Sequence, residues 1–475
     1  MTAETLMRRT GAAAVLLSLV GAVAWWFTGD GLVARWLGPA LERAPGLLAL
    51  HASLDPAVRD LAYFQAVAMP AGLRFLAGLA AVGAVLAWSP YPARLQALWR
   101  ESDPPRVLAA TRIVVFLAVA AYTDPAEIAR FAALPPGLEM APPGLSWLPL
   151  PGPVLAQILA WLTIGAALAA AVGIRPRLAA WLCVAAGVVS LGVPQFFGKI
   201  NHYHHLLWFA SVLAAGPSWQ VWSVQRAEGR GRVLPWIWLL IGLIYFFPGF
   251  WKWVVAGPSW LDGSALATML HAQWYRIDAV VGVRFDSGWL AAASGTAVLV
   301  FELGFVIALA WRRARGLFVL GALAFHGLTF LVAGISFWSL AVCLVAFAPA
   351  HWMGDGGRAA TAVAAGGLSD RVGHFLVGAA LVTGFAGIDT WPIAVYPTFA
   401  GLPDTVYPTV LLETDRGERI DPYRSPGLAE SFGQSRIMGL VNQVLQDAER
   451  GPALRSSEPT ASTDCSFCHR ASSRA

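Results

Sequence analysis

The chain has 475 residues, of which 57% are hydrophobic and only 13% are charged, and its mean hydropathy is +0.59. Soluble domains carry about a quarter charged residues, so this composition excludes an ordinary soluble globular protein. The net charge of +5 is modest, and the arginines lie in short scattered clusters, which argues against a nucleic-acid-binding surface. Lysine occurs only as Lys199 and Lys252, although lysine and arginine together number 33.

Long apolar windows recur along the chain, and a membrane-spanning helix needs about 20 largely apolar residues. We therefore expect an all-α, polytopic transmembrane helix bundle of about nine to eleven spans, followed by a short extracytoplasmic C-terminal tail. The first window is short enough for a signal peptide, but its end lacks a small-x-small cleavage pattern, so a retained helix is preferred. The windows are 11–27, 71–88, 108–122, 154–172, 178–193, 203–215, 233–248, 291–311, 316–333, 337–350 and 372–387.

Arginines are concentrated in every second segment between these windows. The cytoplasmic loops of membrane proteins carry the excess of lysine and arginine. We therefore expect a multi-pass protein of the cell inner membrane with a cytoplasmic N-terminus, where Arg8 and Arg9 lie. The C-terminal tail and the segments around Lys199 and Lys252 are then periplasmic.

Composition divides the chain into four parts. Residues 1–104 are expected to form a membrane hairpin with an extracytoplasmic loop, and residues 105–388 the main transmembrane domain. Residues 389–450 mix aromatic and charged side chains and are expected to form a small extracytoplasmic module. Residues 451–475 are rich in Ser, Thr, Pro and Ala, the composition of a flexible tail.

A histidine-rich segment, KINHYHH, lies at the predicted outer end of one window. Polar groups at membrane depth are costly unless they face a cavity, so we take Lys199, Asn201, His202, Tyr203 and His205 as site candidates. The alternative is an interfacial belt, with His and Tyr at headgroup level. His202 and His205 could pair at i and i+3, but no carboxylate lies nearby in sequence, so no metal site is predicted.

A second cluster reads YFFPGFWK and then WLDG. We expect Pro248 and Gly249 to break the helix at the outer membrane boundary. Lys252 and Trp260 are the site candidates here. The alternative is a snorkelling lysine within an aromatic belt of interfacial tryptophans.

Four more polar residues fall inside or beside apolar windows. His326 is a candidate for substrate binding, and a satisfied packing histidine is the alternative. Arg74, Arg112 and Glu302 should face the bundle interior. Pairing among these three residues is expected rather than catalysis.

Five segments occur in an order that resembles a known membrane domain. They are AATRI at 109–113, NHYHHLLW at 201–208, YFFPGFWK with WLDG at 245–263, FELGF at 301–305 and FHGLTFLVAGISFW at 325–338. Together they resemble the domain shared by vitamin K-dependent γ-carboxylase and its bacterial relatives, the horizontally transferred transmembrane (HTTM) domain. The resemblance covers about residues 108–349 and marks residues 105–388 as an HTTM-like domain.

The resemblance implies a lysine base that drives the oxygenation of reduced vitamin K. Lys199 would carry this role, with Asn201 and His202 beside it and Lys252 assisting electrostatically. A lysine in a desolvated pocket becomes a usable neutral base, whereas arginine stays protonated. The tail is shorter than the lumenal domain of the carboxylases, so we expect a quinol oxygenase or epoxidase that uses a reduced, vitamin K-like quinone. Tyr203, His205, Trp260 and His326 would bind this substrate.

The sequence CSFCH near the C-terminus has the spacing of c-type haem attachment. Cys465 and Cys468 would add to the haem vinyl groups, and His469 would ligate the iron. The alternatives are a redox-active disulfide and a pair without function.

Two other functional classes remain open from the sequence. One is a non-catalytic electron-transfer protein that carries haem c and meets a periplasmic redox partner. The other is a transporter or scaffold. In each case the expected partners are the lipid bilayer and a lipid-soluble small molecule, and no nucleic acid.

Overall fold

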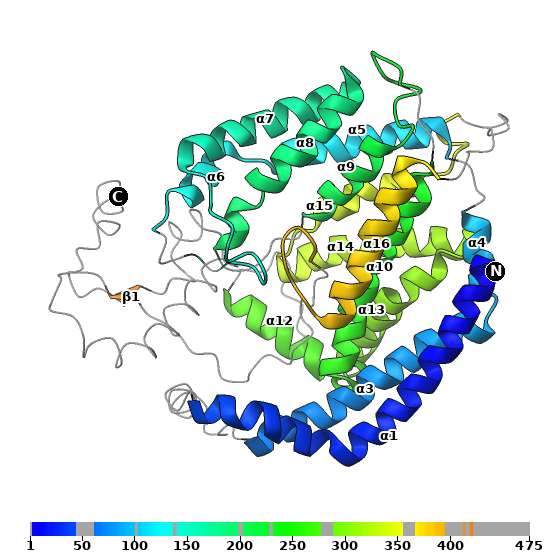
Figure 1. Cartoon of the computed structure of the whole chain (residues 1–475), viewed down its shortest axis with the longest axis vertical. Helices are drawn as coiled ribbons and strands as arrows, with labels where there is room; N and C mark the ends of the chain where they lie inside the picture. The colour runs from blue at the N-terminus through cyan, green and yellow to red at the C-terminus, as the bar shows by residue number, and fades with distance from the viewer. Residues whose placement is uncertain are drawn as a thin grey trace.

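The computed structural model describes residues 2–43, 61–99, 103–135, 139, 141–197, 203–227, 231–276, 288–354, 366–394, 412–413 and 419–420. These residues are largely helical and form a helix bundle, as predicted (Figure 1). The elements are α1 (Ala3–Arg43), α3 (Leu61–Trp88), α4 (Tyr91–Leu98), α5 (Pro105–Tyr122), α6 (Pro125–Ala132), α7 (Pro153–Val172), α8 (Pro176–Ser190), the 3-10 helix η2 (Val193–Phe196), α9 (His205–Ala215), α10 (Leu234–Val255), α11 (Pro258–Leu261), α12 (Ser264–Arg276), α13 (Gly288–Ala308), α14 (Arg312–Ala333), α15 (Trp338–Ala341), the 3-10 helix η3 (Val342–Phe347), α16 (Leu368–Ala386), and the antiparallel strands β1 (Leu412–Glu413) and β2 (Arg419–Ile420).

Eight helices of the described part are long and apolar enough to cross a membrane, which identifies an integral membrane protein. This number is lower than the nine to eleven spans predicted. The windows at 203–215 and 337–350 form only short apolar helices, and α16 is not among the eight. α9 is 11 residues long and almost completely buried, so protein rather than lipid surrounds its ends, as a non-spanning segment at membrane depth requires.

Proline and glycine mark the ends of these helices in the way their backbone chemistry dictates. Several helices, α7 and α10 among them, carry proline in their first turn, where the missing N–H would have had no helical partner. α7 and α14 stop at Gly173 and Gly334, which have φ of 83° and 64°. Glycine occupies this left-handed conformation without a steric penalty.

Helix α10 is the most buried of the candidate spans and packs between α13 and α16 (Figure 1). Glycines permit this close packing. A Cβ atom at Gly249 would lie 2.8 Å from the Cβ of Glu302 on α13, and one at Gly384 on α16 would lie 2.2 Å from the ring of Phe247. The predicted break at Pro248 is wrong, because α10 continues through this proline to Val255.

The N-terminal helices α1 and α3 lie side by side at one edge of the molecule (Figure 1). Gly11 and Gly83 face each other across this pair, with no room for a side chain on either. From α3, Arg74 donates to the backbone carbonyls of Val254 and Val255, 2.8 and 2.7 Å away. This contact ties the α1–α3 pair to the C-terminal end of α10.

Two cysteines pack as small hydrophobic side chains. Cys183 and Cys343 are free thiols without exposed surface. The Cys343 thiol donates to the carbonyl of Ser339, one turn earlier, at 3.2 Å.

Candidate functional site

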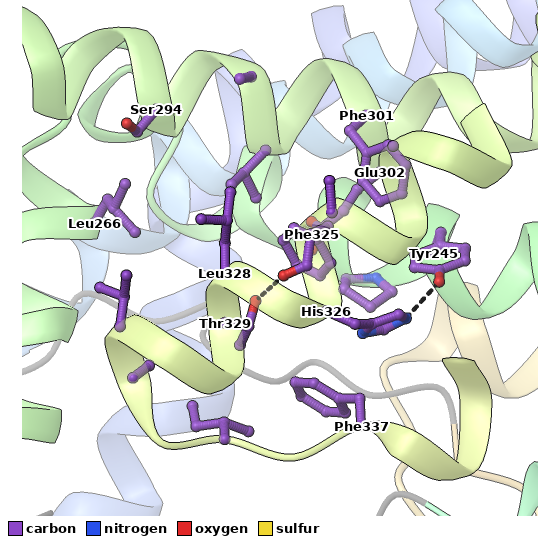
Figure 2. Close-up of a pocket in the computed structure, with 18 of the residues that line it drawn as sticks. Tyr245, Leu266, Ser294, Phe301, Glu302, Phe325, His326, Leu328, Thr329 and Phe337 are labelled. Atoms are coloured by element: carbon purple, nitrogen blue, oxygen red, sulfur yellow. Dashed lines mark hydrogen bonds between the residues drawn. The ribbon is translucent and has the colours of Figure 1, made fainter. Parts of the chain in front are cut away.

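A cavity of about 570 Å³ lies among α9, α10, α12, α13 and α14 (Figure 2). Most of its lining is apolar. The polar and aromatic-donor side chains that line it are His205, Tyr245, Lys252, Trp260, Ser294, Glu302, His326 and Thr329. An apolar pocket of this size with a few converging polar groups is the usual form of a site for a small molecule.

A buried ion pair forms part of the wall. Lys252 on α10 and Glu302 on α13 are each 4% exposed, and the lysine Nζ lies 2.6 and 2.7 Å from the two carboxylate oxygens. The same Nζ lies 5.2 Å from the ring centroid of Trp260. A buried charge is tolerated only when it is paired, and here the carboxylate and the aromatic ring supply that compensation.

A second pair of polar side chains lies beside the first. The hydroxyl of Tyr245 and Nε2 of His326 are 2.6 Å apart, and both residues are buried. Nδ1 of His326 is buried and has no hydrogen-bond partner among the described residues, and the same holds for Nε1 of Trp260. Buried polar atoms are nearly always satisfied in native proteins, so these two atoms mark a place where a ligand would supply the missing partners.

Helical spacing explains why α10 contributes so much to the cavity. Tyr245, Pro248 and Lys252 follow one another at i, i+3 and i+7, and therefore lie on one face of a continuous helix. Gly249 brings α13 within reach, so that the Lys252 side chain meets Glu302.

The cavity is elongated and chemically uneven. Figure 2 shows Tyr245 and His326 at one end and Leu266 and Ser294 at the other, with Leu328 between α13 and α14 on the way. Apart from Ser294, Thr329 and Trp260, the lining away from Tyr245 and His326 is largely aliphatic. This arrangement suits a molecule with one polar end and one apolar end.

Four of the residues predicted from the sequence line this cavity, namely His205, Lys252, Trp260 and His326. Tyr203 is not in the lining; its hydroxyl accepts a hydrogen bond from Gln195 at 2.7 Å. Lys199, Asn201 and His202 lie outside the described residues. So do Cys465, Cys468 and His469, together with nearly all of the predicted 389–450 module and the whole 451–475 tail.

Two interpretations of the charged residues need correction. Lys252 does not snorkel towards an interface, because it is buried and paired with Glu302. Glu302, Arg74 and Arg112 do not pair among themselves. Arg74 binds the carbonyls at the end of α10, and Arg112 donates to the carbonyls of the 218–222 segment. Backbone carbonyls accept from both guanidinium groups, and Glu302 binds Lys252 instead.

Sequence reasoning did not assign Glu302 and Tyr245 to the site. A signal was present for each: Glu302 is a lone acid in an apolar window, and Tyr245 lies seven residues before Lys252. The expected helix break at Pro248 separated Tyr245 from Lys252, so their common face was missed.

Within the described residues, no group of three or more His, Cys, Asp or Glu side chains is arranged to hold a metal ion. The cavity therefore offers hydrogen bonds, one ion pair and apolar surface. Comparison with protein-family models, with curated proteins and with solved structures gives no match for this chain.

Proposed function

We propose that this integral membrane protein binds a lipid-soluble quinol or quinone in the cavity between α10, α13 and α14. One observation carries the proposal: an apolar cavity inside a membrane helix bundle has Tyr245, His326, Lys252 and Glu302 in its wall. The volume of about 570 Å³ lies within the usual range for small-molecule sites. A quinone ring with its two oxygen atoms matches a site that has both apolar surface and separate polar groups.

The histidine pair supports recognition of a ring oxygen. When the Tyr245 hydroxyl donates to Nε2 of His326, the neutral imidazole carries its proton on Nδ1. That Nδ1 has no partner within the described structure. It would donate to a quinone carbonyl or, in the other tautomer, accept from a quinol hydroxyl.

The ion pair supports proton transfer at the second polar position. Lys252 and Glu302 are held together in a buried setting, so each charge depends on the other for compensation. A quinol hydroxyl would pass its proton to Glu302, and the quinolate oxygen that remains would be stabilised by the ammonium charge of Lys252. In this scheme the two residues act as one proton-accepting unit.

The proposal retains the predicted placement in the cell inner membrane with a cytoplasmic N-terminus. Lys252 lies in the last turn of α10, and arginine-rich segments fall at the opposite end of the spans flanking it. By the positive-inside rule, the ion pair would then lie nearer the periplasmic face. Cysteine accessibility at Ser264, an exposed residue at the start of α12, tests this placement.

The oxygenase or epoxidase activity that the HTTM resemblance implies depends on Lys199, Asn201 and His202. Those residues are outside the described structure, so the proposal is restricted to binding and proton transfer. The haem c prediction for Cys465, Cys468 and His469 likewise stays a prediction.

Equilibrium binding of a radiolabelled quinone to the purified chain in lipid nanodiscs tests the proposal. Tyr245→Phe removes the hydroxyl that fixes the tautomer of His326, so Nδ1 is no longer held as the donor to the quinone oxygen and affinity should fall about tenfold. Tyr91→Phe is the matched control, since its hydroxyl donates to the carbonyl of Val306 outside the cavity. Equal affinities of wild type and Tyr245→Phe would contradict the assignment of this end of the cavity.

A further inference from the structure

The cavity reaches the outer surface of the bundle between α13 and α14. Among its lining residues, Ala297 on α13 and Ala324 and Leu328 on α14 are exposed, and Leu328 keeps 60% of its surface. Small side chains at positions 297 and 324 leave the space between the helices open. In Figure 2 Leu328 points into the region between the two helices.

Towards the C-terminal end of α13 and the N-terminal end of α14, aromatic side chains fill the space between the two helices. The rings of Phe301 and Phe318 stack with centroids 5.9 Å apart and an interplanar angle of 14°. A Cβ atom at Gly304 would lie 2.9 Å from the Phe318 ring. The gap is therefore confined to the part of α13 and α14 that lies beyond this aromatic contact.

The surface around the gap is apolar and exposed. Val300 on α13 and Leu320 and Leu331 on α14 are 61, 66 and 40% exposed, and both helices are long and apolar enough to span the membrane. A gap in such a surface opens sideways into the bilayer. Lipid tails are as apolar as the lining of the gap, so an apolar ligand chain can pass between them with little cost in free energy.

We propose that this gap is a lateral opening through which the polar head of an amphiphile enters, and that a long apolar chain then remains in the gap between Ala297 and Ala324. The inference rests on the proposed function and adds to it the route by which the ligand enters and the place where its chain lies. One ligand would then occupy both places: its chain would lie in the exposed apolar gap, and its head would meet the unpartnered nitrogens of His326 and Trp260 in the buried part of the cavity.

Two radiolabelled probes test this inference on the full chain in phosphatidylcholine and phosphatidylglycerol nanodiscs. One is a naphthoquinone with a long isoprenoid chain, and the other is 2-methyl-1,4-naphthoquinone, which has the ring without the chain. Ala324→Trp should weaken the chain-bearing probe about tenfold or more and leave the chainless probe within about twofold of wild type. Leu320→Trp is the matched control, because Leu320 is an exposed residue of the same helix outside the cavity lining; it should change neither affinity.

The outcomes separate this inference from the proposed function. Unchanged binding of the chain-bearing probe to Ala324→Trp overturns the inference, as does equal weakening of both probes. Equal affinity of wild type for the two probes also overturns it, because the chain then contributes nothing. Failure of wild type to bind either probe overturns the proposed function and the inference with it. Ala297→Leu, a smaller change on the facing helix, provides the same comparison if Ala324→Trp does not fold.

Discussion

Acidic side chains lie at both ends of α10, but the two ends use them differently. At the N-terminal end, Asp103 accepts from the backbone N–H groups of Val233 and Leu234 at 2.7 and 3.3 Å, and Asp370 accepts from the indole of Trp236 at 3.0 Å. At the C-terminal end, Glu302 binds the side chain of Lys252 and faces the cavity.

The difference separates a structural use of charge from the functional use that we propose. Carboxylates at a helix N-terminus satisfy N–H groups that have no helical partner and complement the helix dipole. Asp103 therefore fixes where α10 begins. The ion pair of Lys252 and Glu302 has no such task, since it joins two side chains beside a cavity and leaves the helix ends to other groups.

The largest expected effect is loss of one member of the ion pair. Lys252→Met or Glu302→Gln alone leaves the partner buried without compensation, which costs on the order of 3–5 kcal/mol of unfolding free energy. The double variant Lys252→Met/Glu302→Leu should recover most of this loss, because apolar side chains replace both charges. Thermal unfolding in detergent measures both effects.

The affinity of the same double variant for quinone tests whether the ion pair also serves ligand binding. The double variant should be folded but should bind the chain-bearing quinone at least about tenfold more weakly than wild type. A stable double variant with wild-type affinity would mean that the ion pair serves only the fold, like the acids at the other end of α10.

A smaller effect is expected where α10 meets α13. Gly249→Ala places a Cβ 2.8 Å from the Cβ of Glu302, and such overpacking costs about 1–3 kcal/mol. It should also weaken ligand binding, because it separates the helices that hold the ion pair. Gly242→Ala is the matched control, since the new Cβ would meet the end of the Leu309 side chain at 2.9 Å and the Cα of Val306 at 3.3 Å, neither of which belongs to the ion pair. If both variants reduce binding equally, the spacing at the ion pair has no special role.

The smallest effect concerns pH and the N-terminal end of α10. Burial of the carboxylate raises the pKa of Asp103 from 3.8 to about 6, although its hydrogen bonds to Val233 and Leu234 oppose the rise. The folded state then holds this proton more tightly than the unfolded state. The stabilisation from this group is present below pH 3.8 and is lost as the pH rises through about 6.

The variant Asp103→Asn does not titrate, so it should flatten this part of the stability profile. It should cost about 1 kcal/mol as a weakened cap. Thermal unfolding of wild type and variant between pH 4 and 7 checks the prediction. If the stability of Asp103→Asn changes with pH as steeply as that of wild type, the titrating group is a different residue.

The sequence allowed the membrane bundle and part of the site to be predicted. Apolar windows and the prolines and glycines between them determine where helices run, and Lys252 and His326 stood out because charged and polar groups are rare in such windows. The hydrogen-bond partners of the charged side chains could not be predicted in the same way. Arg74 and Arg112 bind backbone carbonyls, and this depends on which chain segments meet in the fold.

The shared face of Tyr245 and Lys252 was missed for a local reason. Proline usually ends or kinks a helix, and a helix that stopped at Pro248 would separate the two residues. In the structure, packing against α13 and α16 keeps α10 helical through the proline. Tertiary contacts therefore determine that α10 continues through Pro248, although the local preference of proline is to end a helix.

Photo-crosslinking tests the central claim most directly. A quinone with an azide on its ring, irradiated with the full chain in nanodiscs and followed by peptide mass spectrometry, should label α10 near Tyr245 and Lys252 and α14 near His326. An excess of unmodified quinone should suppress this labelling. Labelling confined to peptides of α7 and α8, or labelling that excess quinone does not reduce, would contradict a ligand site in this cavity.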